Sequence, residues 1–476
     1  MSANPTHVNL LSRLNRIPVT RTVVGIIILL SFVWLAEAFD IGIVGPVLST
    51  LEKDWALVNW QQGLLAVAST FGVVVGMIPS GLLADRFGRR RVVLLGILFF
   101  SVLTLAGALM PNYWSLLFIR FLAGVGEGAV LPMPYLFLSE FVRSRQRAVS
   151  VGFSNGILTA AYVVPNLASL WALDTFPASF AWRVPFILGG VPLLLLIPLF
   201  LWLPESPRYL LKQNREVEVL RLVERLEDEA KLPHDAKLSD ERTRVLLAQS
   251  EEEERLPLRT MVAQPFLSRG LMMAMQLTAA LILFYILQVF GPKLLESRGT
   301  GNGAALLYSG LMMVVAGFGS VAQGFLSDKL GRKTILAVYV VLASTGCLLF
   351  AFGSSTAVVF LAGGLTAFFG LGIFPVAKLC VAEQYPTQLR GRGVYLNEMT
   401  ARTLSGVVTT YFIPFLLQTY GNRPIFFGVA VVLILFNLPF FFFGRETAKV
   451  QMEEAGTKLS FSRLDRETFT QQVSSR

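Results

Sequence analysis

Residues 81–90 read Gly81-Leu-Leu-Ala-Asp85-Arg-Phe-Gly88-Arg89-Arg90, and residues 324–333 repeat the pattern as Gly324-Phe-Leu-Ser-Asp328-Lys-Leu-Gly331-Arg332-Lys333. The offset between the copies is 243 residues, and each copy is a short charged stretch between two long apolar blocks. At the same offset, two further pairs of residues correspond, namely Glu140 with Glu383 and Arg147 with Arg390. Independent matches at one offset indicate that the chain consists of two related halves.

The composition is typical of a membrane protein. Hydrophobic residues make up 54% of the 476 residues and charged residues only 15%, and the mean hydropathy is +0.61. In soluble domains about a quarter of the residues are charged. The apolar blocks have the length of about 20 residues that an α-helix needs to cross about 30 Å of hydrocarbon, where a helix satisfies its own backbone hydrogen bonds.

We therefore expect an all-α integral membrane protein with twelve transmembrane helices in two six-helix pseudo-symmetric bundles. The expected helices are residues 22–51, 58–84, 91–110, 114–142, 148–171, 183–203, 268–295, 302–327, 333–352, 356–383, 391–419 and 422–444. Parallel repeats of this kind place a binding site between the bundles, near the midplane of the bilayer. The first block is too long for a signal peptide and contains Glu37 and Asp40, so we expect it to remain as the first helix.

The blocks divide the chain into five parts. We expect a cytoplasmic N-terminal segment at 1–21, an N-terminal bundle at 22–203, a cytoplasmic linker with helices at 204–267, a C-terminal bundle at 268–444 and a cytoplasmic tail at 445–476. The orientation follows from the short loops, because cytoplasmic loops carry an excess of Lys and Arg. One side carries Arg86, Arg89, Arg90, Arg91, Arg143, Arg145, Arg147, Lys329, Arg332, Lys333, Arg390 and Arg392. The other side carries only Lys53, Arg183, Lys293, Arg298 and Arg423.

Several classes of function are disfavoured. A net charge of +10 would suggest a nucleic-acid partner for a soluble protein, but here the basic residues lie in loops, so we expect none. His7 and His234 lie outside the apolar blocks, while Cys347 and Cys380 lie within them, which disfavours a metal site, another cofactor and a disulfide framework. We find no His-Glu-x-x-His and no phosphate-binding loop, so we expect no enzyme and an ion gradient as the energy source.

The repeated loop resembles the signature loop of the major facilitator superfamily. Pro204-Glu-Ser-Pro-Arg208 after the sixth helix, and the fourth helix from Arg120 through its glycines to Glu140, are similar to motifs of the sugar-porter branch. Gly444-Arg-Glu446-Thr447 is similar to the closing motif of that branch, although Arg445 replaces the usual proline.

Other segments resemble a particular group within the superfamily. Leu14-Asn-Arg-Ile-Pro-Val-Thr-Arg21 ahead of Phe39-Asp40-Ile-Gly42 resembles the bacterial metabolite:proton symporters, which include niacin and aromatic-acid carriers. Glu383-Gln-Tyr-Pro-Thr387, with Arg402 further on, resembles the same group and the organic-ion transporters. The resemblance implies alternating access in the bacterial inner (plasma) membrane. The expected partners are a small-molecule substrate, protons and the lipid bilayer, and we expect the protein to function as a monomer.

The repeated loop and the acidic and basic residues that follow it are candidates for a cytoplasmic gate. Asp at a helix end and Arg in the loop can form ion pairs that hold the cytoplasmic side in one state. Alternatively, the arginines only set the topology, and both roles can coexist. The candidates are Asp85, Arg89, Glu140, Arg147, Asp328, Arg332, Glu383 and Arg390.

Seven ionisable side chains fall inside the expected transmembrane helices. They are Glu37, Asp40, Arg120, Glu127, Lys378, Glu398 and Arg402. A charge at the bilayer centre costs about 2.5–3.5 kcal/mol on insertion scales, so seven unpaired charges would cost on the order of 20 kcal/mol. A domain's net stability is only about 5–15 kcal/mol. We therefore expect most of these side chains to be paired or in contact with water.

Asp40 is the candidate proton carrier, and Arg120 is its candidate partner. Their positions resemble those of the aspartate and arginine of proton-coupled sugar porters. Burial raises the pKa of a carboxyl and a nearby arginine lowers it, so a contact that changes between two states would let Asp40 gain and lose a proton. A static ion pair is the alternative. Glu37, one turn earlier, would share the proton, line its entry path or simply face water.

The remaining charges are candidate substrate ligands. Glu127 would contact substrate or serve as a buried partner for another charge. Glu398 and Arg402 are four residues apart and can pair on one helix, while an Arg402 that faces a cavity would hold a carboxylate. Lys378 follows a proline that can kink its helix, so it points into the cavity or extends toward the cytoplasm. Weaker polar candidates are Tyr135, Asn155, Tyr162, Gln276, Tyr285 and Gln288.

The sequence thus favours proton-coupled symport of a small organic acid, such as an aromatic or pyridine carboxylate like nicotinate. An antiporter that exports organic cations or drugs is one alternative, in which Glu37, Glu127 and Glu398 would bind the substrate. A sugar:proton symporter is another. A non-transporting receptor with the same fold would bind ligand without flux.

Overall fold

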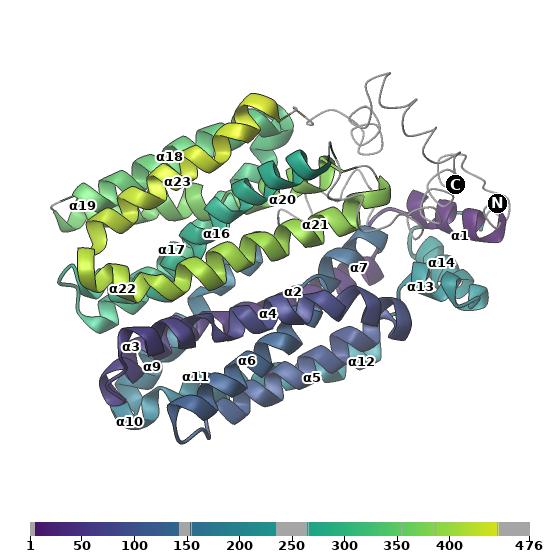
Figure 1. The fold of residues 1–476 in the computed structure, drawn as a ribbon. Coiled ribbons are helices and arrows are strands. Elements are labelled where there is room, and N and C mark those ends of the chain that lie inside the picture. The colour runs from purple at the N-terminus through teal and green to yellow at the C-terminus, as the bar shows by residue number, and fades with distance from the viewer. Residues whose placement is uncertain are drawn as a thin grey trace.

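The computed structural model describes residues 5–141, 153, 155–234, 264, 266–353, 355–385, 387–444 and 446. Within these ranges the regular elements are all helices, and most of them run side by side along one direction (Figure 1). The first half of the chain, in purple and blue, forms one bundle, and the second half, in teal, green and yellow, forms the other (Figure 1).

The first half contains α1 (Pro5–Arg16), α2 (Arg21–Gly42), α3 (Val44–Asp54), α4 (Asn59–Phe87), α5 (Arg89–Gly107), α6 (Tyr113–Val130), α7 (Met133–Phe141), α9 (Val163–Thr175), α10 (Ala178–Ala181), α11 (Arg183–Leu188), η1 (Val191–Leu195) and α12 (Leu196–Trp202). Helix α9 is the later part of a membrane-length helix over Asn155–Thr175. After the bundle come two short helices, α13 (Pro207–Lys212) and α14 (Glu216–Glu229).

The second half contains α16 (Phe266–Glu296), α17 (Asn302–Leu330), α18 (Arg332–Phe352), α19 (Thr356–Leu365), η3 (Thr366–Leu371), α20 (Phe374–Glu383), α21 (Thr387–Arg402), η4 (Thr403–Thr409), α22 (Thr410–Tyr420) and α23 (Asn422–Phe443). Segments η3 and η4 are π-helical. π-helical turns occur frequently at functional sites, and η4 begins directly after Arg402.

Several helices that the hydropathy predicts as single spans are interrupted. The first is divided into α2 and α3 at Ile43, because Pro46 has no N–H group to donate to the carbonyl of Gly42. The fourth is divided into α6 and α7 around Leu131 and Pro132 for the same reason. These breaks lie beside the buried charges of both helices.

Ten segments of the described chain are long and apolar enough to cross a membrane. The other two predicted spans are the fourth, α6 with α7, and the eleventh, α21 with η4 and α22. The fourth contains Arg120 and Glu127, and the eleventh contains Glu398 and Arg402. These charges lower the local hydropathy, so both helices that fail the hydropathy criterion carry candidate site residues.

Helices α4 and α6 pack closely through glycines. A Cβ atom at Gly124 would overlap the carbonyl oxygen of Ser69, and a Cβ at Gly128 would overlap that of Val73. In the other direction, a Cβ at Gly72 would overlap the carbonyl oxygen of Phe121. Small residues at this spacing allow two helix backbones to approach. The contact places Ser69 beside the Glu127 side chain.

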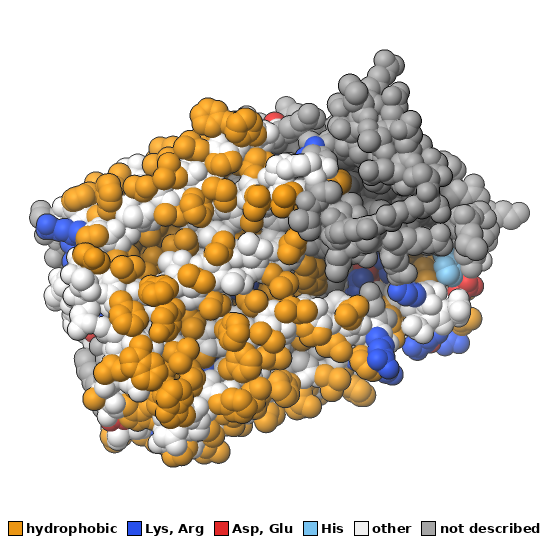
Figure 2. All heavy atoms as spheres, in the orientation of Figure 1, with side chains coloured by type: hydrophobic (Ala, Val, Ile, Leu, Met, Phe, Trp, Pro, Cys, Tyr) orange, Lys and Arg blue, Asp and Glu red, His pale blue; other side chains and the backbone are white. Residues whose placement is uncertain are grey.

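The outer surface of the bundles is apolar. Figure 2 shows hydrophobic side chains over the length of the helices, and Lys and Arg side chains toward the two ends. Large exposed apolar side chains such as Leu82, Leu109 and Phe443 are 75%, 77% and 82% exposed. Exposed apolar area of this extent is expected for helices that face lipid.

At the end remote from α14, the two bundles contact each other (Figure 1). A Cβ atom at Gly45 of α3 would lie 2.6 Å from the carbonyl oxygen of Val289 and 2.7 Å from that of Gln288, both in α16. The Lys293 ammonium donates a hydrogen bond to the Gln62 side chain at 2.8 Å. The bundles are therefore joined at this end by backbone contact as well as by side chains.

At the other end, α1 is attached to α14 by a buried ion pair. Arg13 donates to both carboxylate oxygens of Glu227, at 3.1 and 2.6 Å, and Arg16 donates to the same carboxylate at 2.9 Å. The backbone N–H of Thr22 donates to Glu229 at 2.9 Å, which also ties the start of α2 to α14. These contacts join the N-terminal segment to the first part of the linker.

Candidate functional site

The seven predicted intramembrane charges come from four elements, and most of them are buried. Glu37 and Asp40 lie on α2, Arg120 and Glu127 on α6, Lys378 on α20, and Glu398 and Arg402 on α21. Each of them except Lys378 is at most 8% exposed. The Lys378 side chain is 23% exposed. Their mutual contacts form two groups, one in each half of the chain.

Asp40 and Arg120 form a buried, bidentate ion pair in the first half. One terminal nitrogen of Arg120 donates to both carboxylate oxygens of Asp40, at 2.9 and 2.8 Å, and the other donates to the Asp40 backbone carbonyl at 3.0 Å. The Thr104 hydroxyl of α5 also donates to this carboxylate. The Arg120 guanidinium lies over the ring of Phe186, 5.8 Å from its centroid. Both carboxylate oxygens of Asp40 thus accept hydrogen bonds.

Glu127 lies beside this pair but has few partners of its own. The Ser69 hydroxyl donates to its Oε2 at 3.3 Å, while its Oε1 receives no hydrogen bond in the described part of the chain. The carboxyl groups of Glu127 and Asp40 lie within hydrogen-bonding reach of each other. The prediction left open whether Glu127 contacts substrate or partners another charge, and here it adjoins Asp40.

Arg402 is the centre of the second group. Its Nε donates to Glu398 Oε1 at 2.9 Å, and one terminal nitrogen donates to the Tyr285 hydroxyl of α16 at 3.1 Å. The Lys378 ammonium lies 3.7 Å from the same Glu398 oxygen. The predicted pairing along one helix is therefore present. The second terminal nitrogen of Arg402 has no hydrogen bond to a described protein atom and remains available to a ligand.

Glu37 lies between the two groups. It is within electrostatic range of Arg402, Lys378 and Glu398 from the second half, and of Asp40 from its own helix. One of its carboxyl oxygens has no hydrogen-bond partner among the described residues. Because Glu37 connects the charges of the two halves, a change in either group alters the electrostatic environment of the other.

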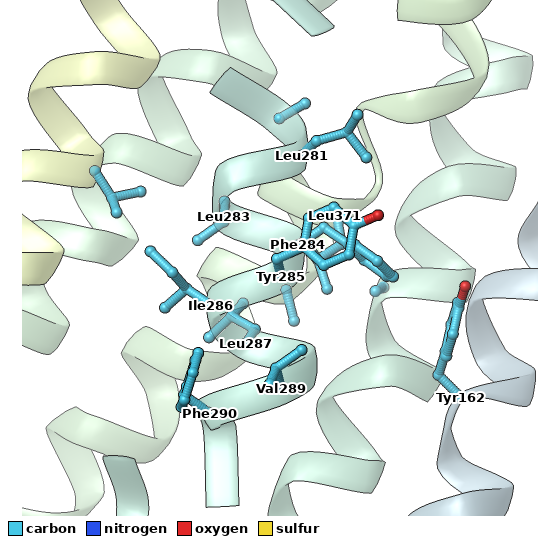
Figure 3. Close-up of a cluster of buried hydrophobic side chains, with 14 of the residues drawn as sticks. Tyr162, Leu281, Leu283, Phe284, Tyr285, Ile286, Leu287, Val289, Phe290 and Leu371 are labelled. Carbon is cyan, nitrogen blue, oxygen red and sulfur yellow. The ribbon is translucent and has the colours of Figure 1, made fainter. Parts of the chain in front are cut away.

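Aromatic rings lie beside Arg402. Phe284 packs edge-on against Tyr162 and Tyr285, with ring centroids 5.2 Å apart in each case, and against Phe374 at 6.0 Å. Figure 3 shows Phe284 and Tyr285 on α16, and Tyr162 beside them on a helix of the first half. Tyr162 is within electrostatic range of both Glu37 and Arg402. The Arg402 guanidinium therefore has an aromatic wall next to it.

The weaker polar candidates have different surroundings. Gln276 and Gln288 of α16 are each 1% exposed, and neither amide has a hydrogen-bond partner among the described residues. Asn155 is buried, and the Thr159 hydroxyl donates to its backbone carbonyl at 2.8 Å. The Tyr135 side chain lies outside the described residues.

Sequence reasoning missed four residues of the site. Thr104 and Ser69 each donate to a buried carboxyl, and Phe284 and Phe374 form the aromatic wall. A threonine inside the apolar block at 91–110 was a detectable signal for Thr104. The two phenylalanines had no distinguishing signal, because the chain contains 37 of them.

The predicted gate is partly described. Arg89 pairs with Glu140, and the Ser206 hydroxyl donates to the same Glu140 carboxylate. Glu205 accepts hydrogen bonds from the backbone N–H groups of Arg89 and Arg90 at 3.0 and 3.1 Å. The predicted motif after the sixth helix therefore binds the repeated loop directly.

The second half repeats this arrangement. Glu446 accepts hydrogen bonds from the backbone N–H groups of Arg332 and Lys333, both at 2.9 Å. The preceding glycines, Gly88 and Gly331, both have a φ of +92°, which favours glycine. Five of the predicted gate side chains lie outside the described residues, namely Asp85, Arg147, Asp328, Glu383 and Arg390.

Two further observations concern other kinds of site. A groove of about 830 Å³ between α4, α6 and the η4–α22 segment is lined by apolar side chains such as Phe71, Phe118 and Val408, and no charged residue lines it. This groove is separate from the charged cluster. In the described ranges, no group of three or more His, Cys, Asp or Glu side chains is arranged to hold a metal ion.

Comparisons with known proteins agree with this architecture. The xylose transporter XylE from E. coli in an inward open conformation aligns with a TM-score of 0.73 over 91% of this chain and 99% of that chain, at 17% identity. The structure of the proton:xylose symporter XylE bound to 6-bromo-6-deoxy-D-glucose aligns with a TM-score of 0.74 over 91% of this chain and 98% of that one, also at 17% identity. These likenesses confirm the predicted fold, with twelve helices in two bundles.

Three curated relatives are similar in sequence to this chain over most of their length. The niacin transporter NiaP of Acinetobacter baylyi is 26% identical over 94% of this chain and 100% of the relative. The 4-hydroxybenzoate transporter PcaK of Pseudomonas aeruginosa is 29% identical over 78% and 81%, and the arabinose-proton symporter of Bacillus subtilis is 24% identical over 92% and 96%. Residues 26–459 match the family model described as sugar (and other) transporter. The chain is therefore a multi-pass membrane transporter that belongs to the sugar (and other) transporter family of the major facilitator superfamily.

Proposed function

We propose that this transporter carries a small aromatic or pyridine carboxylate into the cell together with protons, by alternating access of its two bundles. One observation carries the proposal. The Arg402 guanidinium, fixed by Glu398 and Tyr285, has one terminal nitrogen without a hydrogen-bond partner among the described residues, beside the rings of Phe284 and Tyr162. A guanidinium next to aromatic rings suits a planar ring that bears a carboxylate.

The proton-coupling part of the proposal rests on the Asp40–Arg120 pair and on Glu37. Glu37 is a buried carboxyl within electrostatic range of both Arg402 and Asp40, so that binding of an anion at Arg402 changes the charge balance around Glu37. The names of two relatives, a niacin transporter and a 4-hydroxybenzoate transporter, support the substrate class. The proposed setting is the bacterial inner membrane, with the N-terminus, linker and C-terminus in the cytoplasm and the monomer as the functional unit.

A second candidate is sugar:proton symport. It is favoured by the arabinose-proton symporter among the relatives and by the motif at Pro204–Arg208. The buried cations argue against it, because a neutral sugar leaves the free nitrogen of Arg402 without a counter-charge. Export of organic cations is less well supported, since the Arg402 nitrogen that has no hydrogen bond among the described residues belongs to a cation, which would repel a cationic substrate.

The test is uptake by the purified protein in proteoliposomes with an imposed pH gradient, inside alkaline. We expect accumulation of labelled nicotinate or 4-hydroxybenzoate, and loss of that accumulation in Arg402→Ala. Labelled arabinose and a labelled organic cation serve as the competing substrates. Accumulation of arabinose, with neither carboxylate transported, would replace the carboxylate proposal by the sugar alternative.

A further inference from the structure

Glu127 is buried, and helix packing fixes its position. Among the described residues it forms no ion pair with a cation. Its side chain is 0% exposed, and the close contact of α4 with α6 at Gly124 and Gly128 fixes its position. Ser69 provides its one hydrogen bond, to Oε2, and Oε1 has no protein donor in the described ranges. A carboxylate in this environment would be poorly solvated and unpaired.

Asp40 is in the opposite situation. Both of its oxygens accept hydrogen bonds from Arg120, and one also accepts from Thr104. The second terminal nitrogen of Arg120 is bound to the Asp40 backbone. The guanidinium is therefore committed to Asp40 and is available to compensate only one negative charge.

The two carboxyls lie within hydrogen-bonding reach of each other. Two ionised carboxylates can only accept hydrogen bonds, so a hydrogen bond between them requires one bound proton. Because both oxygens of Asp40 already accept from Arg120, and Glu127 Oε1 has no donor among the described residues, the proton belongs on Glu127, which then donates toward the Asp40 carboxylate. Sharing of one proton by two adjacent carboxyls makes their titrations interdependent.

The charges around Glu127 also favour a proton on its carboxyl group. The groups that face it are Asp40 and Glu37 on α2, Arg120 on its own helix, and the Tyr162 hydroxyl and Ser69 hydroxyl from neighbouring helices. Including the second half, the buried cluster contains four carboxyls, Glu37, Asp40, Glu127 and Glu398, and three cations, Arg120, Lys378 and Arg402. One proton makes this cluster neutral.

We propose that Glu127, rather than Asp40, carries the transported proton, while Asp40 stays ionised against Arg120. The inference rests on the proposed function and assigns the proton-carrying group within it. A substrate carboxylate at Arg402 adds one negative charge to the cluster, so neutrality then requires a second proton. Glu37, one turn from Asp40 on α2, is the acceptor for it. Each proton returns to water on the side to which the cluster next opens.

The main test separates exchange from gradient-driven uptake in proteoliposomes. Glu127→Gln should reduce exchange of labelled for unlabelled 4-hydroxybenzoate far less than it reduces gradient-driven accumulation, because exchange needs no net proton release. The same variant should lose at least tenfold of the accumulation driven by a pH gradient, and Glu127→Asp should restore part of it. If Glu127→Gln still accumulates the label against its gradient like the parent, the inference is overturned.

A second readout does not depend on any substrate. The infrared spectrum of the parent protein at neutral pH should contain a band from a protonated carboxyl that is absent from Glu127→Gln, with Ser69→Ala shifting its frequency. A parent protein without this band, or a variant that retains it, would overturn the inference. Absence of carboxylate transport by the parent, together with a Glu127-dependent band, would instead reject the proposed function and leave the protonation of Glu127 established.

Discussion

Glu205 and Glu446 occupy equivalent positions in the two halves, since each carboxylate binds the first two backbone N–H groups of the helix that follows the repeated loop. These are α5 and α18. The N-terminus of a helix carries unpaired N–H groups and a partial positive charge, which a carboxylate satisfies. The segment after the sixth helix thus caps α5, and the segment after the twelfth helix caps α18 in the same way.

Removal of this carboxylate should destabilise the first bundle. We expect Glu205→Ala to lower the stability by about 0.5–2 kcal/mol, the usual cost of losing a helix cap. Glu205→Gln keeps a hydrogen-bond acceptor and should lose less. Thermal unfolding of the purified variants, followed by circular dichroism, measures the difference. Equal unfolding midpoints for Glu205→Ala and the parent would contradict the role of Glu205 as a cap.

The glycine that precedes the capped helix should be intolerant of a side chain. Gly88 has a φ of +92°, and a Cβ there would overlap the Glu205 carboxylate. Gly88→Ala should therefore cost about 1–3 kcal/mol from backbone strain alone. Gly81→Ala in α4, the helix before Gly88, is the matched control, because a Cβ there has no neighbour within 4 Å. The expected order of unfolding midpoints is Gly81→Ala at or above the parent, and Gly88→Ala below it.

The contact between α1 and α14 should open in acid. Burial alone would raise the pKa of Glu227, but hydrogen bonds from Arg13 and Arg16 outweigh it and hold the pKa below its usual value of 4.5. A carboxyl with a lowered pKa stabilises the contact at higher pH, and this stabilisation is lost as the pH falls through the lowered value. The protection of α1 against hydrogen exchange, relative to the intrinsic exchange rate at each pH, should therefore fall as the pH drops below the usual value of 4.5.

The control for this experiment is Glu227→Gln, which cannot ionise. It should exchange α1 amides faster than the parent already at pH 7 and should show little further change in acid beyond the intrinsic effect of pH on exchange. Breaking a buried ion pair by removing one partner costs about 3–5 kcal/mol, which is ample for detection. A parent protein that protects α1 equally at pH 7 and pH 3 would contradict the assignment.

Tyr285 should affect the affinity for a carboxylate through Arg402. Tyr285→Phe removes the hydroxyl that accepts from the guanidinium at 3.1 Å. A hydrogen bond to a charged group contributes about 1.5–3 kcal/mol, so we expect the KM for 4-hydroxybenzoate to rise about tenfold or more. Tyr308→Phe in α17 is the matched control, because that hydroxyl donates to the Phe360 carbonyl instead. A larger effect of Tyr308→Phe on KM would count against the Arg402 site.

The sequence predicted the charged cluster better than its surroundings. Asp40, Arg120 and Arg402 were recognisable because a charge inside an apolar block is costly and therefore rare. Their actual partners depend on which helices become neighbours, and no local signal pairs Thr104 with Asp40 or Phe284 with Tyr162. The cost of burial identifies functional candidates, whereas their contacts depend on tertiary packing.

Helix existence was predictable from hydropathy, but helix continuity was not. The break at Ile43 lies within a stretch whose hydropathy is that of an unbroken span, and hydropathy does not mark the π-helical turn after Arg402 either. Pro46 gave a partial signal for the first break. The segment at Thr403–Thr409 contains no proline, so its π-helical geometry depends on how η4 packs against its neighbours.

The contact of Gly45 with the α16 backbone limits how the protein can open. Where only side chains block a path, a change of rotamer in one side chain can open part of that path, because side chains move independently. Here main-chain atoms of two helices abut, and main-chain atoms move only with the helix that contains them. Opening of that end thus requires α3 and α16 to move apart at Gly45, because no change of side-chain rotamer can separate main-chain atoms of the two helices.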